Sequence, residues 1–345
     1  MSKILKRSEQ IRQFILTHVE EHPQDVAVLA AQEFGVSRQA INRHIQALVK
    51  QNAIVVEGST RSKRYCLHPL VEWTKTYSLK SPLEEDRVWD SDIKSLIADL
   101  PDNVRAIWYY GFTEILNNAI DHSLGHHVSI TVKRTAISTE IFIHDDGEGI
   151  FKKIQRELNL YDERHAVLEL SKGKLTTDPK RHSGQGIFFS SRMFDAFDIL
   201  SGTVHFSHQF HRPEDWIAEW QMPGSGTSVF MCLSNNTSRT SKQVFDQFSS
   251  GDDYAFTKTV VPVRLAQYGD EMLVSRSQAK RLLARVDKFK VVIFDFAGVE
   301  AIGQAFADEI FRVFKQQHSE IEMMSVNGNE EVNKMIRRAQ SSLSD

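Results

Sequence analysis

The stretch that most constrains the fold is Phe112–Ser123, which reads FTEILNNAIDHS. Its polar residues recur at helical spacing, so they share roughly one face of a helix. They are Glu114, Asn117, Asn118 and Asp121. The aliphatic residues between them supply the other faces. We expect the aliphatic faces of such a helix to pack in a hydrophobic core and its polar edge to line a functional site. A polar edge alone, however, is more often only a solvated surface.

Length and composition limit the kinds of protein that this chain can be. Its 345 residues are enough for about two or three domains, and 41% hydrophobic with 25% charged residues is typical of a soluble globular protein. Only two cysteines are present, Cys66 and Cys232, which argues against a disulfide framework or a zinc cluster and favours the cytoplasm. The sequence also lacks an apolar run long enough to span a membrane, and charges interrupt its N-terminus, so we expect neither a membrane span nor a signal peptide.

The first seventy residues predict a small helical domain. Apolar periodicity indicates helices at 8–19, 25–34 and 38–51, followed by two short strands at 54–57 and 64–67. Ser37 is placed to cap the third helix. This order of helices and hairpin resembles a winged helix-turn-helix domain over residues 1–70.

The charge of this region supports the resemblance. Residues 1–66 contain ten Lys and Arg against six Asp and Glu, in a chain whose net charge is −3. The resemblance implies contacts to DNA from the third helix and from the hairpin, through Arg38, Gln39, Asn42, Arg43, Arg61, Lys63 and Arg64. The alternative is a protein-docking winged helix with a basic surface. Residues 71–90 are interpreted as a linker with room for a docking strand.

The middle of the chain mixes helical and strand patterns. We expect helices at 91–100 and 104–121, a long polar segment at 151–181, and a helix at 187–194. Strands are expected at 128–136, 140–144, 197–207, 216–221 and 228–233.

Three glycine-containing turns accompany the Phe112–Ser123 helix. They are Asp145-Asp146-Gly147-Glu148-Gly149-Ile150, Ser183-Gly184-Gln185-Gly186 and Gly226-Thr227. Together with the helix, in this order, they resemble the GHKL ATPase fold of gyrase-type topoisomerases, MutL, histidine kinases and anti-sigma-factor kinases. The resemblance covers residues 91–234 and implies an α/β sandwich of the Bergerat type that binds ATP and Mg²⁺.

The resemblance also implies roles for individual residues. Asn118 corresponds to the family's Mg²⁺ ligand, and Glu114 to the acid that activates water or a hydroxyl. Asp121 and His122 would line the pocket near the nucleotide, while Asp145 would accept a hydrogen bond from the adenine amino group. Gly147, Gly149 and Ile150 belong to that adenine-binding turn, and Thr227 would close the pocket through water.

The phosphate end of the site is expected around the second glycine turn. Ser183, Gly184, Gln185 and Gly186 open a helix whose N-terminal N–H groups would face the phosphates. Residues 172–183 supply Lys174 and Thr177 in a loop long enough to act as a lid.

Each of these pieces has a simpler interpretation when taken alone. Glu114 and Asn118 could be a solvated helix edge, the Asp145 turn could be an ordinary turn or a calcium-loop look-alike, and the second glycine turn could be just a helix start. The spacing of His122, His165 and His182 fits no set of metal ligands. A helix with a phosphoacceptor histidine is not seen upstream, so a self-phosphorylating sensor kinase is not expected.

The last hundred residues predict a small α/β domain. After a polar linker at 235–253, strands are expected within 254–265, at 291–296 and at 320–326, with helices at 277–286, 304–314 and 330–339. This alternation over 254–345 resembles a STAS-like domain, as in anti-sigma-factor antagonists. Residues 302–306 carry no hydroxyl where phospho-regulated members have one. The alternative is a docking or dimerisation domain.

The sequence therefore predicts an α+β multidomain protein made of a winged helix, a GHKL domain and a STAS-like domain. The leading hypothesis is a cytoplasmic transcriptional regulator that couples ATP·Mg²⁺ to DNA binding and to a protein partner. The second is a protein Ser/Thr kinase of the anti-sigma-factor type. The third is a conformational ATPase that clamps as a homodimer, like MutL.

Overall fold

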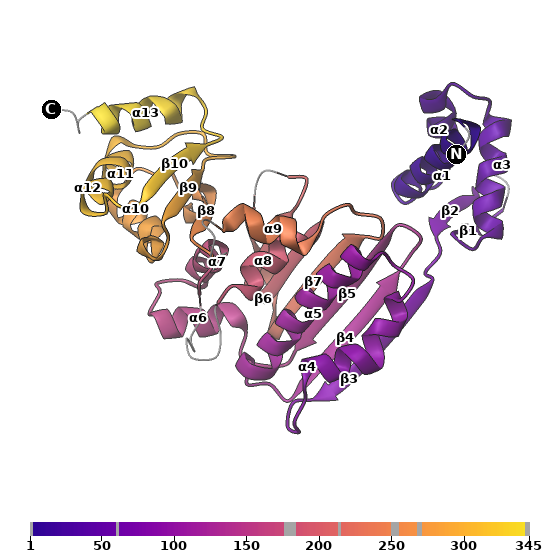
Figure 1. Ribbon diagram of the computed structural model, residues 1–345, viewed down its shortest axis with the longest axis horizontal. Coiled ribbons are helices and arrows are strands. Elements are labelled where there is room, and N and C mark those ends of the chain that lie inside the picture. The colour runs from indigo at the N-terminus through magenta and orange to yellow at the C-terminus, as the bar shows by residue number, and fades with distance from the viewer. Residues whose placement is uncertain are drawn as a thin grey trace. The chain divides into compact units, whose positions relative to one another are not determined.

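The computed structural model is a mixed α/β multidomain structure (Figure 1). It describes residues 3–59, 62–175, 184–212, 215–249, 255–267 and 271–341, without the side chains of 3–6 and 221–223. The chain divides into two compact units. The first consists of Met1–Lys75, Ile130–Ile141 and Cys232–Thr237, and the second of Thr76–Ser129, Phe142–Met231 and Ser238–Asp345.

Three helices and a hairpin build the N-terminal part of the first unit. The helices are α1 (Lys3–His18), α2 (Val26–Phe34) and α3 (Arg38–Lys50), followed by antiparallel strands β1 (Ile54–Glu57) and β2 (Arg64–Leu67). Their core contains Ile15, Val19, Ile41 and Ile45, which are fully buried. The Ser37 hydroxyl accepts a hydrogen bond from the Ala40 N–H at 3.2 Å, so the predicted cap of α3 is confirmed.

A five-stranded sheet organises the middle of the chain. Its strands, in the spatial order β3-β4-β5-β7-β6, are β3 (Val71–Ser78), β4 (His127–Arg134), β5 (Ser138–Asp145), β7 (Trp216–Ser234) and β6 (Ala196–Gln209). The two strands expected at 216–221 and 228–233 are parts of the single strand β7. Residues 71–78 lie in the segment interpreted as a linker with room for a docking strand, and they form the edge strand β3 of the sheet.

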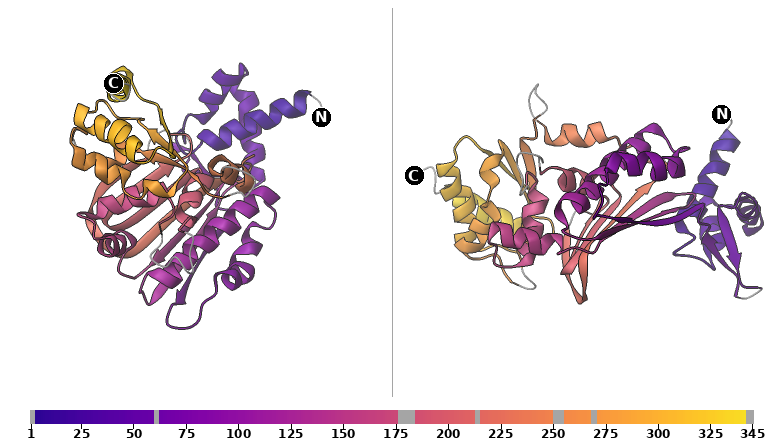
Figure 2. Two further views of the ribbon diagram at one scale, coloured as in Figure 1. Left: turned by 60° about the vertical axis from the view of Figure 1, so that its left-hand side comes forward. Right: turned by 90° about the horizontal axis from the view of Figure 1, so that it is seen from below.

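Helix α5 (Asp102–His122) carries the Phe112–Ser123 motif across one face of this sheet, beside α8 (Gly186–Met193) and α9 (Ser241–Phe248) (Figures 1 and 2). Its buried residues recur every three or four positions: Val104, Ile107, Trp108, Gly111, Phe112, Ile115, Leu116 and Ala119. A Cβ on Gly111 would lie 2.3 Å from the Phe194 ring, so this glycine lets α5 approach the end of α8 closely. The opposite edge of α5 is left for the polar residues of the motif.

The segment expected to be long and polar, 151–181, contains two helices among its described residues. They are α6 (Ile150–Leu158) and α7 (Glu163–Lys172), and every residue of α7 from His165 to Lys172 is buried. Local polarity misled the sequence interpretation because the polar side chains of α7 find partners from a distant part of the chain. Residues 85–88 form the short helix α4 (Glu85–Val88), and π- and 3₁₀-helical turns at 89–97 stand where a helix was expected at 91–100.

The C-terminal part of the second unit is a parallel three-stranded sheet with helices. Strands β8 (Lys258–Pro262), β9 (Val291–Asp295) and β10 (Glu322–Val326) pair in the order β10-β9-β8. The helices are α10 (Arg276–Leu283), α11 (Gln304–Asp308), which continues through 309–314, α12 (Lys315–Gln317) and α13 (Glu330–Ser341). The alternation of strands and helices expected from the sequence is present. None of the described helices combines the length and apolar character needed to cross a membrane.

Candidate functional site

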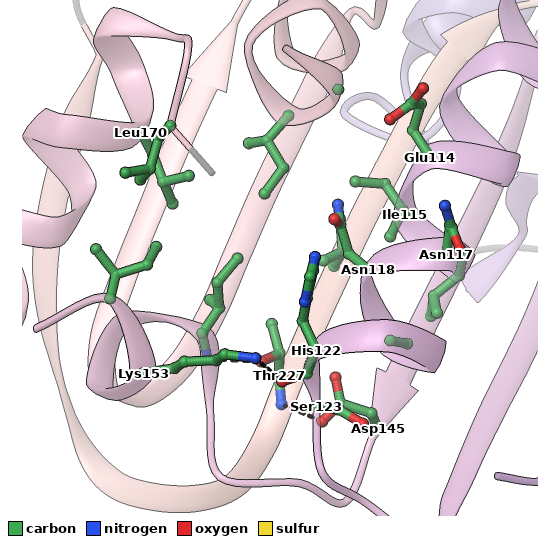
Figure 3. Close-up of a pocket in the computed structure, with 18 of the residues that line it drawn as sticks. Glu114, Ile115, Asn117, Asn118, His122, Ser123, Asp145, Lys153, Leu170 and Thr227 are labelled. Carbon is green, nitrogen blue, oxygen red and sulfur yellow. Dashed lines mark hydrogen bonds between the residues drawn. The ribbon is translucent and has the colours of Figure 1, made fainter. Parts of the chain in front are cut away.

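A cavity of about 280 Å³ lies between α5, α6, the end of α7, the start of α8 and strands β5 and β7 (Figure 3). Eight of the residues that the sequence assigns to a nucleotide site line it: Glu114, Asn118, His122, Asp145, Ile150, Gly184, Gly186 and Thr227. The three glycine turns and the helix motif therefore meet at one cavity.

Helix α5 supplies one wall. Glu114, Asn118 and His122 are four residues apart, so they follow one edge of the helix, and all three are half-buried (Figure 3). Asn117 and Ser123 also line the cavity. Asp121, in contrast, is exposed and is not among the lining residues. Its position one residue before His122 turns it to a different side of the helix.

Asp145 lies at one end of the cavity, at the end of β5. Its side chain is buried, and its Oδ1 accepts hydrogen bonds from the N–H groups of Gly147 (2.9 Å) and Thr227 (3.3 Å). Burial raises the pKa of this carboxyl, and the two backbone donors oppose the shift. Oδ2 has no hydrogen-bond partner among the described residues. A carboxylate oxygen thus faces the cavity with its capacity to accept still available.

Close backbone packing fixes the position of Asp145. A Cβ on Gly226 would lie 1.8 Å from the Asp145 carbonyl oxygen, and one on Gly147 would lie 2.0 Å from the carbonyl oxygen of Ser123. The Thr227 hydroxyl accepts a hydrogen bond from the Ile150 N–H at 2.9 Å. Gly147 and Gly149 do not line the cavity. They let the turn behind Asp145 fold tightly, and Gly149 does so with φ +91°.

The second glycine turn approaches the Glu114 end of α5. A Cβ on Gly186 would lie 2.0 Å from Glu114 Oε2, so only a glycine lets the carboxylate and the first turn of α8 come so close. The first N–H groups of a helix lack partners within that helix and favour an anion beside them, and the Glu114 carboxylate lies there. Gln185 is not among the lining residues. Thr177 and Ser183 lie outside the described residues.

Two lysines, Lys153 and Lys174, differ from the sequence expectation for this cavity. Lys174 turns away from it: its Nζ donates to the Lys288 carbonyl at 2.7 Å and lies 4.5 Å from the Phe289 ring centroid. Lys153, which the sequence interpretation missed, lines the cavity, and its Nζ donates to the His122 carbonyl at 2.9 Å. Helical spacing from Ile150 was the available signal, because residues i and i+3 of a helix share a face.

A metal ion at this cavity would use oxygen ligands. Among the described residues, no group of three or more His, Cys, Asp or Glu side chains is arranged to hold a metal. The Asn118 amide and the Glu114 carboxylate are oxygen donors of the type that Mg²⁺ prefers.

A second candidate surface is the outer face of α3. Arg38, Gln39, Asn42 and Arg43 are all exposed on it. Arg64 of β2 is exposed, and the Lys63 ammonium lies 5.0 Å from the centroid of the Tyr65 ring. Arg61 lies outside the described residues. The predicted DNA-contacting residues of α3 thus share one accessible face.

Comparison with known proteins identifies one region. Residues 278–333 match the family described as STAS-like domain of unknown function (DUF4325). The matched segment runs from α10 into α13 and includes β9 and β10, so the C-terminal part of the chain is a STAS-like domain. No curated protein matches the chain.

Proposed function

We propose that the protein is an ATP-dependent regulator in which the cavity binds ATP with Mg²⁺. The observation that carries this proposal is Asp145: a buried carboxylate with one oxygen fully used and the other facing the cavity. The adenine amino group would donate to Oδ2. Guanine has a carbonyl oxygen at that position, and two acceptors would repel each other, so the site is expected to select adenine.

The remainder of the cavity suits the other parts of the nucleotide. Aliphatic side chains of Ile143, Ile150 and Val229 line it and offer apolar contacts for a base. Gly184 and Gly186 line the cavity at the start of α8, where backbone N–H groups would meet the phosphates, and Lys153 supplies a positive charge toward the Asp145 end. The order of these groups supports the GHKL-like interpretation of residues 91–234.

Asn118 is the residue proposed to hold Mg²⁺ through its amide oxygen, since it lies between Glu114 and His122 on the cavity edge of α5. Bound Mg²⁺ neutralises charge on phosphate oxygens. Glu114 is proposed to accept a proton from the attacking group. If that group is water, the protein is an ATPase; if it is a Ser or Thr hydroxyl, the protein is a kinase of the anti-sigma-factor type.

In this proposal, the N-terminal region and the STAS-like domain pass the effect of ATP binding on to other molecules. The winged-helix-like N-terminal region would bind DNA through the exposed face of α3. The STAS-like domain is consistent with partner switching, in which proteins of this class exchange binding partners. A homodimeric clamp like MutL stays the third candidate, and a nucleotide-dependent change in oligomeric state would favour it.

One experiment separates these candidates. Full-length protein is incubated with γ-labelled ATP and Mg²⁺, with and without DNA and candidate partner proteins, beside Glu114→Gln and Asn118→Ala. Release of labelled phosphate that needs Glu114 supports an ATPase, and label on a protein supports a kinase. If neither occurs but ATP changes DNA affinity, the protein senses ATP without turning it over. Absence of ATP binding by the wild type would contradict the proposal.

A further inference from the structure

A seven-residue segment of the chain, 169–175, faces the cavity and the C-terminal region at once. Leu170 and Leu175 line the cavity. Glu169, Lys172 and Lys174 instead contact residues 281–288, at the end of α10 and in the turns that follow it. The same backbone therefore forms part of the proposed nucleotide site and part of the surface on which the STAS-like domain docks.

Buried charges fix this docking. The side chains of Lys172 and Glu169 are only 1% and 4% exposed, and Lys172 Nζ lies 2.7 Å from Glu169 Oε1. Glu169 Oε2 lies 3.1 Å from a guanidinium nitrogen of Arg285. Lys172 Nζ also donates to the carbonyls of Ala284 (2.9 Å) and Arg281 (3.3 Å). Buried ionic groups tolerate little displacement, because each loses its partners before water can replace them.

Further contacts continue beyond the end of α7 toward the cavity. The Thr259 hydroxyl of β8 donates to the Lys172 carbonyl at 2.7 Å, and Arg285 donates to the Lys174 carbonyl. A Cβ on Gly173 would lie 2.8 Å from the Phe256 ring. The Leu175 N–H then donates to the Gly184 carbonyl at 3.1 Å, which joins this segment to the second glycine turn.

We propose that nucleotide binding in the cavity and docking of the STAS-like domain on residues 169–175 favour each other. The docked domain holds Lys174 and Arg285 together, which places Leu175 and Gly184 at the cavity before a ligand arrives. Coupling between two binding equilibria is reciprocal, so the nucleotide must strengthen docking by the same factor. This inference rests on the proposed function, since it takes the nucleotide as the ligand.

The test compares full-length wild type with Arg285→Ala, Lys174→Met and the control Arg337→Ala. Arg337 is an exposed cation on α13 of the same domain. Affinity for ATP·Mg²⁺ is measured by calorimetry, and amide exchange of residues 281–289 is measured with and without ATP. We expect about 5- to 10-fold weaker ATP binding by Arg285→Ala, about 2- to 5-fold weaker binding by Lys174→Met, and wild-type binding by Arg337→Ala. ATP should slow exchange in residues 281–289.

The outcomes distinguish this inference from the proposed function. Suppose that the wild type binds ATP, that both variants bind it as tightly as the wild type does, and that ATP does not change amide exchange in residues 281–289. The proposed coupling is then wrong, while the proposed nucleotide site is still supported. If the wild type does not bind ATP, the proposed function fails first. Lys174→Met removes one hydrogen bond and the cation–π contacts of a half-buried side chain but keeps its aliphatic stem, so it tests the coupling even if Arg285→Ala does not fold.

Discussion

Two buried carboxylates, Asp145 and Glu169, differ in how much of their hydrogen-bonding capacity the protein itself uses. Glu169 is 3% exposed, and each of its oxygens meets a cation, Lys172 or Arg285. Asp145 is 5% exposed, and the two backbone N–H groups that it binds both donate to Oδ1. Its second oxygen faces the cavity.

This difference indicates that the Glu169 carboxylate stabilises the fold, whereas the Asp145 carboxylate is available to bind a ligand. Burying a carboxylate costs desolvation free energy unless it is paired. In the Glu169 cluster, which consists of Glu169, Lys172 and Arg285, the two cations offset that cost within the protein. At Asp145 the cost is only partly offset, because neutral N–H groups replace water on one side of the carboxylate. A ligand donor at Oδ2 would complete it.

Removing the Glu169 carboxylate should strongly destabilise the fold. Glu169→Leu leaves the Lys172 ammonium buried without its anion, which typically costs about 3–5 kcal/mol in the free energy of unfolding. Chemical denaturation of the purified variant measures this loss. The double variant Glu169→Leu with Lys172→Met should recover much of the stability. A Glu169→Leu protein as stable as wild type would show that the cluster is not structural.

Replacing Asp145 should weaken the binding of ATP without destabilising the fold. In Asp145→Asn the amide oxygen can still accept from Gly147 and Thr227, but an N–H₂ group then meets the adenine amino group. Loss of a buried hydrogen bond to a charged group, with a donor left unpaired, predicts about 10- to 100-fold weaker ATP binding. Calorimetry on the folded variant checks this. Unchanged ATP affinity would remove Asp145 from the adenine site.

The same variant should gain relative stability as the pH rises. Burial raises the pKa of Asp145, so the folded state keeps this proton to a higher pH than the unfolded chain does. The resulting penalty is absent below the unfolded pKa of about 4 and complete above the raised folded value. Asn carries no such penalty. Denaturation series below pH 4 and at pH 7 should therefore show a difference that shifts in favour of Asp145→Asn; a shift in favour of wild type would contradict the burial argument.

Lys153 should affect the Asp145 end of the cavity. Its Nζ donates to the carbonyl of His122, about two helical turns from Glu114 and the glycine turn proposed to face the phosphates. Lys153→Met should therefore weaken the binding of ATP and of adenosine to a similar extent, by about 10-fold, as measured by calorimetry. Lys152→Met, the exposed neighbouring lysine, serves as the control. A loss of ATP affinity with unchanged adenosine affinity would place Lys153 at the phosphates instead.

Removing surface charges from α3 should have the smallest effect on the stability of the protein. Arg38→Ala with Arg43→Ala is expected to leave stability unchanged, because both side chains are exposed. DNA affinity should fall, and the slope of log affinity against log salt should decrease by about 2. Fluorescence anisotropy at several salt concentrations measures the slope. An unchanged slope would favour a protein-docking role for this region.

The sequence predicted best where the determinants are local. Helical spacing placed Glu114, Asn117 and Asn118 on one face of α5, and all three line the cavity, although Asp121, predicted on the same face, does not. The glycine turns bring Asp145 and Thr227 to the same cavity. These patterns depend on residues within a few positions of one another, or on backbone that only glycine can form.

Predictions failed where contacts join distant parts of the chain. Lys174 was expected at the phosphates because its neighbours in sequence are polar, but its partner is the carbonyl of Lys288. The buried helix α7 was missed for the same reason, since Glu169 is paired with Arg285 more than a hundred residues away. The hydrophobic periodicity of a sequence does not indicate which distant residues pair with one another.

The proposed nucleotide site is tested most directly by titrating full-length wild-type protein with ATP and with GTP in Mg²⁺ by calorimetry. The proposed contact of the adenine amino group with Asp145 predicts saturable binding of ATP and at least roughly 100-fold weaker binding of GTP, because a site built for a donor rejects an acceptor. Equal affinity for the two nucleotides, or no binding of ATP, would contradict it.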